Sequence, residues 1–413
     1  MTELSLTRKV RLYPTTEQAT EFRRVMSQYR DLCNLASQHY FDNYVFNEKS
    51  QQSLLNKELY HDFRDRSDLG AGLVQSVFKT VIARYRTTET QLRSKPYRYD
   101  TGKKDQNGHA IWSSAPRDLN WLWKPINFHR LQADYVRTKN YSLTNDATLI
   151  SMNGLHGRLK VRYNQRERDF LLRKDIKLGT AKLVTSGGHW FFHVSYTYNV
   201  PDFEMDDVQH VVGIDRGLRF LATTYDERGK SLFFNGGKAV NVRRHDAGLR
   251  KHLQMHNTRN SKRRIRELGH KENRYITWIN HTLTKALIDH YGSHTLFVME
   301  NLTGIKENTL ANVQKNRRYL QVSWSYYQFQ QMLEYKAKQV GSKVVYVNAY
   351  KTSQRCPKCG RINKNNRKHG IHEYQCDRCG YRSNDDRIGA MNIYYLGTMV
   401  RSGASKPSFK PSK

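Results

Sequence analysis

The chain has 413 residues, and its 70 Lys and Arg outweigh 37 Asp and Glu to give a formal net charge of +33. This excess goes beyond what solubility requires and indicates a polyanionic partner. Charge alone also fits a ribosomal-type or membrane-surface protein, but no apolar run approaches the ~18–20 residues of a membrane span. Aromatic residues, at 12% of the chain, add surface on which unpaired bases can stack.

The N-terminal segment MTELSLTRKV contains no apolar signal core, so we expect no export. Four of the five cysteines form two CxxC pairs, which is typical of zinc binding in a reducing compartment rather than of disulfides. We therefore expect a cytoplasmic protein. The fifth cysteine, Cys33, lies on an apolar helical stripe and is expected to be a buried thiol.

The first part of the chain reads as one strand followed by helices. Alternating apolar residues predict a strand over residues 3–13. Thr15 and Gln18 then form a capping-box start for a helix that runs to about residue 45. Helical spacing continues to about residue 93.

The next part changes period. Residues 96–125 mix Tyr, Trp, Gly and Lys without periodicity and are expected to be mostly loop. From 126 to 200 apolar residues alternate, and Gly187-Gly188 between two such runs signals a hairpin. We expect an antiparallel β domain here that the N-terminal strand joins, followed by a polar linker over 201–209.

A second domain begins after this linker. Short apolar runs predict three buried strands, at Val211–Asp215, Thr295–Glu300 and Lys343–Val347. Apolar residues at helical spacing predict helices over 241–275, 276–291, 324–340 and 388–396.

The cysteine pairs have the spacing of a four-thiolate zinc site, with sixteen residues between the pairs. The four predicted ligands are Cys356, Cys359, Cys376 and Cys379. His369 and His372 lie between the pairs and could replace a ligand, although four thiolates suffice. Four thiolates close the coordination shell, so the expected zinc is one structural ion.

Three carboxylates stand where an RNase H-like core would hold two Mg²⁺ ions. Asp215 and Glu300 end predicted strands, and Asp386 starts a predicted helix after the cysteine segment. Two divalent ions, held by three or four carboxylates, activate water and relieve charge on a leaving oxygen. Each residue alone also fits an ordinary surface acid, but their order within one domain favours a metal-dependent nuclease. Asp226 is read as a hairpin-turn residue and left out of the site.

At Asp385-Asp386 one carboxylate must be chosen. We choose Asp386, because Ala390, Asn392 and Ile393 follow it at the spacing with which a helix packs on a sheet.

A basic run within the second domain is predicted to contact nucleic-acid phosphates. Residues 241–275 hold eleven Lys or Arg against three acids, although such a run also fits a solvated helix face. The predicted contacts are Arg259, Lys262, Arg263, Arg264 and Arg266. Trp112, Trp121 and Trp123 either stack bases or anchor loops.

These motifs resemble the TnpB family, RNA-guided nucleases encoded by insertion sequences and related to compact type V CRISPR effectors. The resemblance is strong over 207–400 and loose over 1–206. Ile388 and Gly389 stand where family members often carry Asn and Ala. The matching motifs are Val212-Gly-Ile-Asp215-Arg-Gly217, Val298-Met-Glu300-Asn-Leu302, Tyr350-Lys-Thr-Ser-Gln-Arg-Cys356-Pro-Lys-Cys359-Gly, Cys376-Asp-Arg-Cys379-Gly and Asn384-Asp-Asp386-Arg-Ile-Gly-Ala-Met-Asn392-Ile393.

The resemblance implies an α+β multidomain protein: a wedge-like antiparallel β-barrel with a helical insertion, then an RNase H-like (RuvC) α/β nuclease domain carrying a zinc ribbon. The expected domains are the wedge-like barrel (1–13 with 126–205), the helical recognition domain (14–125), the nuclease domain (206–351 with 384–400), the target nucleic-acid-binding zinc ribbon (352–383) and a disordered tail (401–413).

The implied function is an RNA-guided, Mg²⁺-dependent endonuclease that cleaves double-stranded DNA beside a short adjacent motif. Its partners would be a guide RNA from the transposon end and the target DNA, and it would act as a monomer. The resemblance further implies a bacterial or archaeal, nucleoid-associated protein. The alternatives are a nuclease-dead RNA-guided DNA-binding regulator and a transposase or transposase-associated accessory protein.

Overall fold

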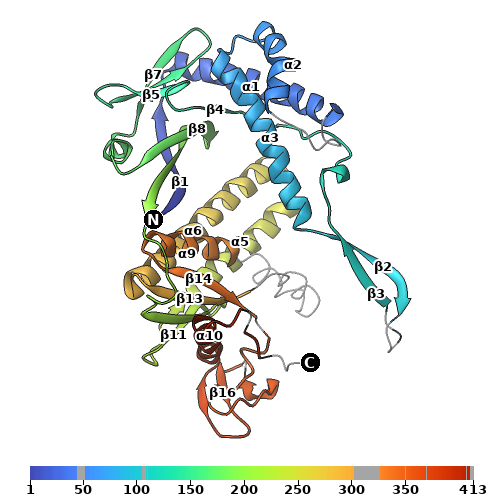
Figure 1. Cartoon of the computed structure of the whole chain (residues 1–413), viewed down its shortest axis with the longest axis vertical. Coiled ribbons are helices and arrows are strands. Elements are labelled where there is room, and N and C mark those ends of the chain that lie inside the picture. Colours follow the sequence, from blue (N-terminus) through green and yellow to red (C-terminus); the bar gives the residue numbers. More distant parts are fainter. Residues whose placement is uncertain are drawn as a thin grey trace. The chain divides into compact units, whose positions relative to one another are not determined.

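The computed structural model describes residues 1–43, 52–104, 108, 110–301, 326–348, 350–368, 370–405 and 407–409. The content is mixed α and β, as expected, and the chain divides into two compact units (Figure 1). One unit comprises Ser5–Asn199, and the other comprises Met1–Leu4 with Val200–Lys413. No helix among the described residues is long and apolar enough to cross a membrane.

The Ser5–Asn199 unit contains a seven-stranded sheet that β1 joins, as expected, between β9 and β7. The sheet order is β4-β8-β9-β1-β7-β6-β5. Gly187 and Gly188 have φ of 57° and 76°, the left-handed values that a tight hairpin between β8 and β9 requires. The strands are β1 Thr2–Tyr13, β4 Gln132–Tyr135, β5 Tyr141–Leu143, β6 Leu149–Asn153, β7 Arg158–Tyr163, β8 Lys177–Ser186 and β9 His189–Val200.

Three helices pack against this sheet in one hydrophobic core. The helices are α1 Thr16–Asn43, α2 Gln52–Asp65 and α3 Ala71–Arg93. The predicted capping box is formed: Gln18 N donates to Thr15 Oγ1 at 3.2 Å, and Thr15 N donates to Gln18 Oε1 at 3.1 Å. Cys33 is buried in this core, as predicted, and burial raises the pKa of its thiol.

The expectation of loop over 96–125 is wrong in part. Tyr97–Lys104 (β2) and Ala110–Ala115 (β3) pair as an antiparallel hairpin, followed by a 3₁₀ turn at Leu119–Trp121. Neither strand buries a side chain, so neither carries the alternation that marks a half-buried strand. The hairpin therefore left no hydrophobic period in the sequence.

The second unit is built on a five-stranded mixed sheet in the order β12-β11-β10-β13-β14. β10 runs parallel to β13, and β13 runs parallel to β14, whereas β11 and β12 are antiparallel to their neighbours. Because β10 and β13 are parallel, Asp215 and Glu300 lie at the same edge of the sheet. The strands are β10 His210–Asp215, β11 Phe220–Asp226, β12 Phe233–Asn235, β13 Thr295–Glu300 and β14 Lys343–Val347.

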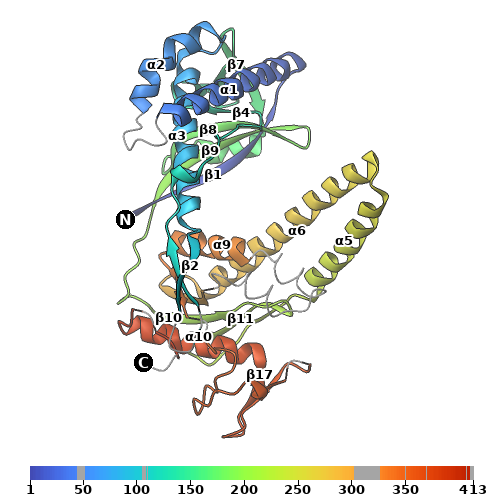
Figure 2. The ribbon, with the colours of Figure 1, turned by 90° about the vertical axis from the view of Figure 1, so that its right-hand side faces the viewer.

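Helices cover both faces of this sheet (Figure 2). α6 and α9 pack on the face that carries Val212 and Ile214, and α10 packs on the face that carries Val211 and Val298. The helices are α5 Gly237–His256, α6 Arg259–Tyr291, α9 Tyr326–Gln339 and α10 Asp385–Arg401. Between β14 and α10 the cysteine segment forms a small sheet of β15 Arg367–Lys368, β16 Glu373–Gln375 and β17 Arg382–Asn384.

The basic segment 241–275 is not one helix. Asn257, in the left-handed conformation (φ 46°), ends α5, and Thr258 caps α6 by accepting a hydrogen bond from Ser261 N. Asn at a helix end and Thr at the next start are the usual signals for such a break. The chain therefore turns back here, and Glu272 on α6 pairs with Arg243 on α5, with Nε and Oε1 3.0 Å apart.

α10 crosses β10 at Gly213. A Cβ at this position would overlap backbone atoms of Ala390 and Tyr394, so a side chain cannot be added without moving the helix or the strand. This close approach fixes how far the start of α10 lies from the end of β10.

Gly213→Ala should destabilise the protein by about 1–3 kcal/mol, because the added methyl overpacks a contact between backbones. Urea unfolding measures the loss. Gly248→Ala is the matched control, since Gly248 lies in α5 with open space around it and alanine favours a helix. Equal stability of the two variants would contradict the packing argument.

Candidate active site and metal centre

The structure brings Asp215, Glu300 and Asp386 together from three elements. Asp215 ends β10, Glu300 ends β13, and Asp386 lies in the first turn of α10. Desolvation by the surrounding protein raises the pKa of Asp215 well above its ordinary value, and the nearby charges of Glu300 and Asp386 raise it further. Asp215 therefore lies within electrostatic reach of both other carboxylates.

Desolvation also raises the pKa of the other two carboxyls. For Glu300 the rise is offset in part by a hydrogen bond from the Thr352 hydroxyl and by the positive charges of Arg216 and Arg367. For Asp386 the neighbouring Asp385 adds to the rise, whereas Arg367 opposes it. The nearby arginines therefore do not fully neutralise this group of carboxylates. Such an excess of negative charge is expected of a site that binds divalent cations.

Backbone and side-chain donors orient these groups. Arg216 N donates to Asp215 Oδ1 at 2.9 Å, and Arg216 Nη2 donates to the carbonyl oxygen of Glu300 at 2.7 Å. Thr352 donates its hydroxyl to Glu300 Oε1. Arg216 therefore links the ends of β10 and β13.

Gly389 lies directly against the Asp215 carboxylate, where there is no space for a side chain. A Cβ on Gly389 would lie 2.7 Å from Asp215 Oδ2, closer than side-chain atoms tolerate. TnpB-like sequences often carry Ala at this position. The residue in which this chain differs from them therefore lies directly beside the Asp215 carboxylate.

Asp385 and Asp386 have different surroundings. Asp385 is fully buried and accepts a hydrogen bond from Arg367 Nε at 2.9 Å, with His372 Nδ1 3.4 Å from its other oxygen. Asp386 accepts from Arg367 Nη2 at 3.2 Å and contributes to the field at Asp215. This geometry favours Asp386 as the carboxylate that shares a site with Asp215. Asp385 instead faces Arg367 and His372.

The cysteine segment gathers its four thiols. Cys356 Sγ lies 3.6 Å from Cys379 Sγ, and Cys359 Sγ lies 3.5 Å from Cys376 Sγ. A tetrahedral zinc ion with ~2.3 Å bonds to sulfur needs thiolates roughly 3.8 Å apart, so the cluster is compatible with zinc. His372 faces Asp385 rather than the thiols, and His369 lies outside the described residues.

The predicted phosphate-binding residues occupy the first turns of α6, and all five are exposed there. Two of them are within reach of one acid: Arg264 lies 3.2 Å and Arg263 3.8 Å from Glu267. Surface pairs of this kind contribute little to stability, so they leave the run available to a partner.

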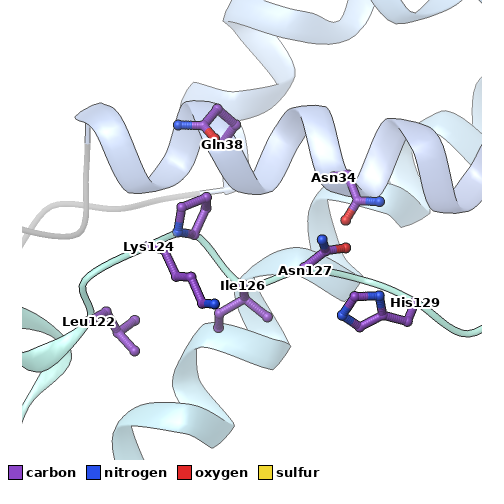
Figure 3. A pocket seen from close by; sticks show the side chains of 8 residues that line it. Asn34, Gln38, Leu122, Lys124, Ile126, Asn127 and His129 are labelled. Atoms are coloured by element: carbon purple, nitrogen blue, oxygen red, sulfur yellow. The ribbon is translucent and has the colours of Figure 1, made fainter.

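A cavity of about 600 Å³ in the Ser5–Asn199 unit is not part of the carboxylate centre. Figure 3 shows Asn34 and Gln38 on α1 across from the segment that runs from Leu122 to His129. None of the described side chains that line it is a carboxylate, so they offer Mg²⁺ no charged oxygen ligand.

Comparison with known proteins places both ligand clusters within matched regions. Residues 193–303 match a family described as probable transposase, and residues 326–393 match the TNB domain of Cas12f1-like proteins. The first region contains Asp215 and Glu300, and the second contains the four cysteines and Asp386.

Several curated proteins are similar over these regions. The chain is 28% identical over 217 residues to a CRISPR-associated endodeoxyribonuclease Cas12f1 of Sulfoacidibacillus thermotolerans, covering 49% of each protein. It is 31% identical over 126 residues to a TnpB-like protein of Methanocaldococcus jannaschii, covering 30% of this chain and 44% of that one. It is 28% identical over 256 residues to the putative RNA-guided DNA endonuclease InsQ of Escherichia coli, covering 57% and 61%.

Over these regions the chain is similar to TnpB-like proteins. It spans about half the length of the curated relatives that it matches. Two solved structures share its fold. The first is a Cas12f1–sgRNA–target DNA complex, with a TM-score of 0.60 and 13% identity, covering 95% of this chain and 99% of that one. The second is the mini-RNA-guided endonuclease CRISPR-Cas_phi3, with a TM-score of 0.52 and 10% identity, covering 98% of this chain and 94% of that one.

Three residues of the centre were not singled out from the sequence. Arg216 and Thr352 lie inside motifs that carried the resemblance, next to Asp215 and before the first CxxC pair. Arg367 had no such signal, because it is one of 70 Lys and Arg and lies between the cysteine pairs.

Cys356→Ser should remove about one zinc per chain and lower the melting temperature, because three thiolates no longer close the shell. Elemental analysis of the purified protein measures the zinc. Cys33→Ala is the matched control, since Cys33 lies in the other unit's core and should leave the zinc content unchanged. Wild-type protein without zinc at full stability would contradict a structural metal.

Asp215→Asn should raise the melting temperature at neutral pH without added Mg²⁺. A carboxyl whose folded-state pKa is raised makes the folded state lose stability as the pH rises through the ordinary carboxyl range toward the raised value. The uncharged amide removes this loss of stability. In a unit of this size, each 1 kcal/mol of added stability raises the melting temperature by about 2–4 °C.

Asp226→Asn is the control for that measurement. Asp226 Oδ1 accepts hydrogen bonds from Arg228 N and Lys230 N in a turn, so its replacement should not stabilise. Mg²⁺ should raise the melting temperature of the wild type more than that of Asp215→Asn. A lower melting temperature for Asp215→Asn would contradict the repulsion.

Proposed function

We propose that the protein is an RNA-guided, Mg²⁺-dependent DNA endonuclease of the TnpB type. The observation that carries the proposal is the convergence of Asp215, Glu300 and Asp386, all with raised pKa, at one edge of the mixed sheet. This centre lies within regions similar to CRISPR-associated endodeoxyribonucleases and to a putative RNA-guided DNA endonuclease. The proposed cut is in double-stranded DNA beside a short adjacent motif.

The proposed domains follow the expected division. Residues 206–351 with 384–400 would form a RuvC-like nuclease domain, and 352–383 a zinc ribbon that contacts target nucleic acid. Residues 1–13 with 126–205 would form the wedge-like barrel, 14–125 the recognition domain, and 401–413 a tail. α10 extends through Arg401, one residue beyond the proposed nuclease boundary.

The carboxylates fit a pair of Mg²⁺ ions as all-oxygen ligands. Asp215, Glu300 and Asp386 would together hold the ions. When bound, the ions supply an activated water and relieve charge on the leaving oxygen. Arg216 N–H fixes one oxygen of Asp215, the Thr352 hydroxyl fixes Glu300, and Arg367 fixes Asp386. These donors hold the ligand oxygens before substrate arrives.

The proposed partners are a guide RNA from the transposon end and a DNA target, bound by one copy of the chain. The net charge of +33 supports two polyanions, because a guide–target heteroduplex is held through its backbone while base pairing reads the sequence. One solved structure with the same fold is a complex with an sgRNA and target DNA. Sequencing the RNA that copurifies, then adding Mg²⁺ and a matching plasmid, tests the proposal directly.

A nuclease-dead regulator on the same scaffold is the main rival. Such a protein would not need to keep three carboxylates crowded against one another, because crowding destabilises the fold without a metal to bind. Their retention at Asp215, Glu300 and Asp386 favours the nuclease.

Asp386→Ala should lower DNA cleavage by several orders of magnitude while RNA and target binding persist, because it removes a metal ligand. Asp385→Ala is the matched comparison and should cost roughly 10–100-fold, since Asp385 acts only through Arg367 and His372. Plasmid cleavage and gel-shift assays measure the two effects. Greater loss at Asp385 would place the ligand one residue earlier.

Reversing Arg263 and Arg264 to Glu should weaken RNA binding, most strongly at low salt, where counterion release contributes most to affinity. Each lost phosphate contact lowers the slope of log affinity against log salt by about one unit. Filter binding across a salt series measures it. An Arg228→Glu variant provides a control reversal at an exposed arginine in the β11 turn. An unchanged slope for Arg263 and Arg264 would show that they form only a solvated face.

A further inference from the structure

The β2–β3 hairpin leaves the end of α3 as a two-stranded arm (Figure 1). Tyr97 and Tyr99 are two residues apart on β2, so their side chains lie on the same face of the arm. Their ring centroids are 6.1 Å apart, and the ring planes differ by only 16°. The arm therefore presents two nearly parallel rings.

Trp121 extends this pair into a row. Its ring lies 5.3 Å from that of Tyr97, and the guanidinium of Arg117 lies 5.2 Å from the Trp121 ring and 5.8 Å from the Tyr97 ring. We define Trp121, Tyr97 and Tyr99 as the aromatic row. Their exposed fractions are 37%, 42% and 41%, so the rings touch one another but remain open to solvent.

The aromatic row belongs to no hydrophobic core of the described chain. Contiguous exposed apolar surface of this kind marks a binding site. Its surroundings are positive: the described residues between 95 and 124 include six Lys or Arg and two Asp. The basic residues are Lys95, Arg98, Lys103, Lys104, Arg117 and Lys124.

We propose that the aromatic row stacks unpaired bases of a single-stranded RNA. Rings of this kind bind the π-face that every base has, and neighbouring cations bind the phosphates between bases. A DNA duplex exposes no base faces until it is opened, whereas a folded RNA presents unpaired loops at all times. Ser113, directly opposite Tyr99, adds a hydroxyl that can meet a ribose 2′-hydroxyl.

The aromatic row shares no residue with the carboxylate centre, and the proposal requires only that the protein binds RNA. RNA-binding measurements therefore test this proposal whether or not the protein cleaves DNA. It differs from the basic run on α6 in its physical basis, because stacking is insensitive to salt whereas phosphate contact is not.

The test uses the full-length protein and a fluorescein-labelled, unstructured 12-nucleotide oligoadenylate RNA at elevated salt. Tyr97→Ala with Tyr99→Ala should weaken binding by about tenfold or more, since each stacked base contributes substantially to affinity. The slope of log affinity against log salt should not change, because no phosphate contact is lost. Tyr97→Phe with Tyr99→Phe keeps both rings and should bind as the wild type does.

Ile111→Ala is the matched control, because Ile111 is 42% exposed on the same hairpin but carries no ring. It should bind as tightly as the wild type. A 12-base-pair RNA duplex should bind the double alanine variant and Ile111→Ala equally, because a duplex offers no free base faces. The same sequence as single-stranded DNA should bind the wild type less tightly than the RNA does, because it lacks the 2′-hydroxyl that Ser113 can meet.

Unchanged RNA affinity in the double alanine variant would overturn the proposal. An equal loss for the RNA duplex would show that the row does not act by stacking. Equal affinity of the wild type for single-stranded DNA and for RNA would overturn the assignment to RNA. If sedimentation showed that the wild type self-associates and the variant does not, with RNA affinity intact, the row would be a surface for a second copy.

Discussion

The close approach of α10 to β10 is the constraint on which the proposed active site depends. Gly213 lets the backbones meet, and Gly389 leaves room beside the Asp215 carboxylate. Asn384 then starts the helix by accepting hydrogen bonds from Asp386 N and Arg387 N. These contacts set the distance between α10 and β10 and the rotation of α10 about its own axis. They therefore determine which of the two adjacent aspartates, Asp385 or Asp386, faces Asp215.

The cysteine segment contributes more to this centre than a candidate zinc site. It contributes Thr352, which donates to Glu300, and Arg367, which bridges Asp385 and Asp386. Asn392 on α10 donates to the carbonyl oxygens of Thr352 and Arg355, which ties the segment to the helix. The thiol cluster can therefore influence the carboxylates through these hydrogen bonds, although none of its ligands lies among them.

The features that the sequence predicted share a strong local signal. The bounds of β14 were predicted to the residue, and the Thr15–Gln18 capping box and the Gly187-Gly188 turn followed from short patterns. The β2–β3 hairpin was missed because a strand exposed on both faces has no hydrophobic period. The carboxylates and cysteines were identifiable because few residue types perform their chemistry at such spacing. Arg367 was not, because nothing in a sequence rich in arginine shows which guanidinium the fold will bury.

Metal ligands can be identified from the sequence, whereas the residues that hold them in place cannot, because the two kinds of residue act in different ways. A metal ligand is recognised by its own chemistry, so the residue type already narrows the choice. A residue such as Arg367 acts by holding others, and burial lowers the pKa of its guanidinium while Asp385, Asp215 and Asp386 more than restore it. Its role exists only after β15 has placed it between two carboxylates. The cation that limits repulsion in the centre is therefore a product of the fold, and only the acids that need it are visible in the sequence.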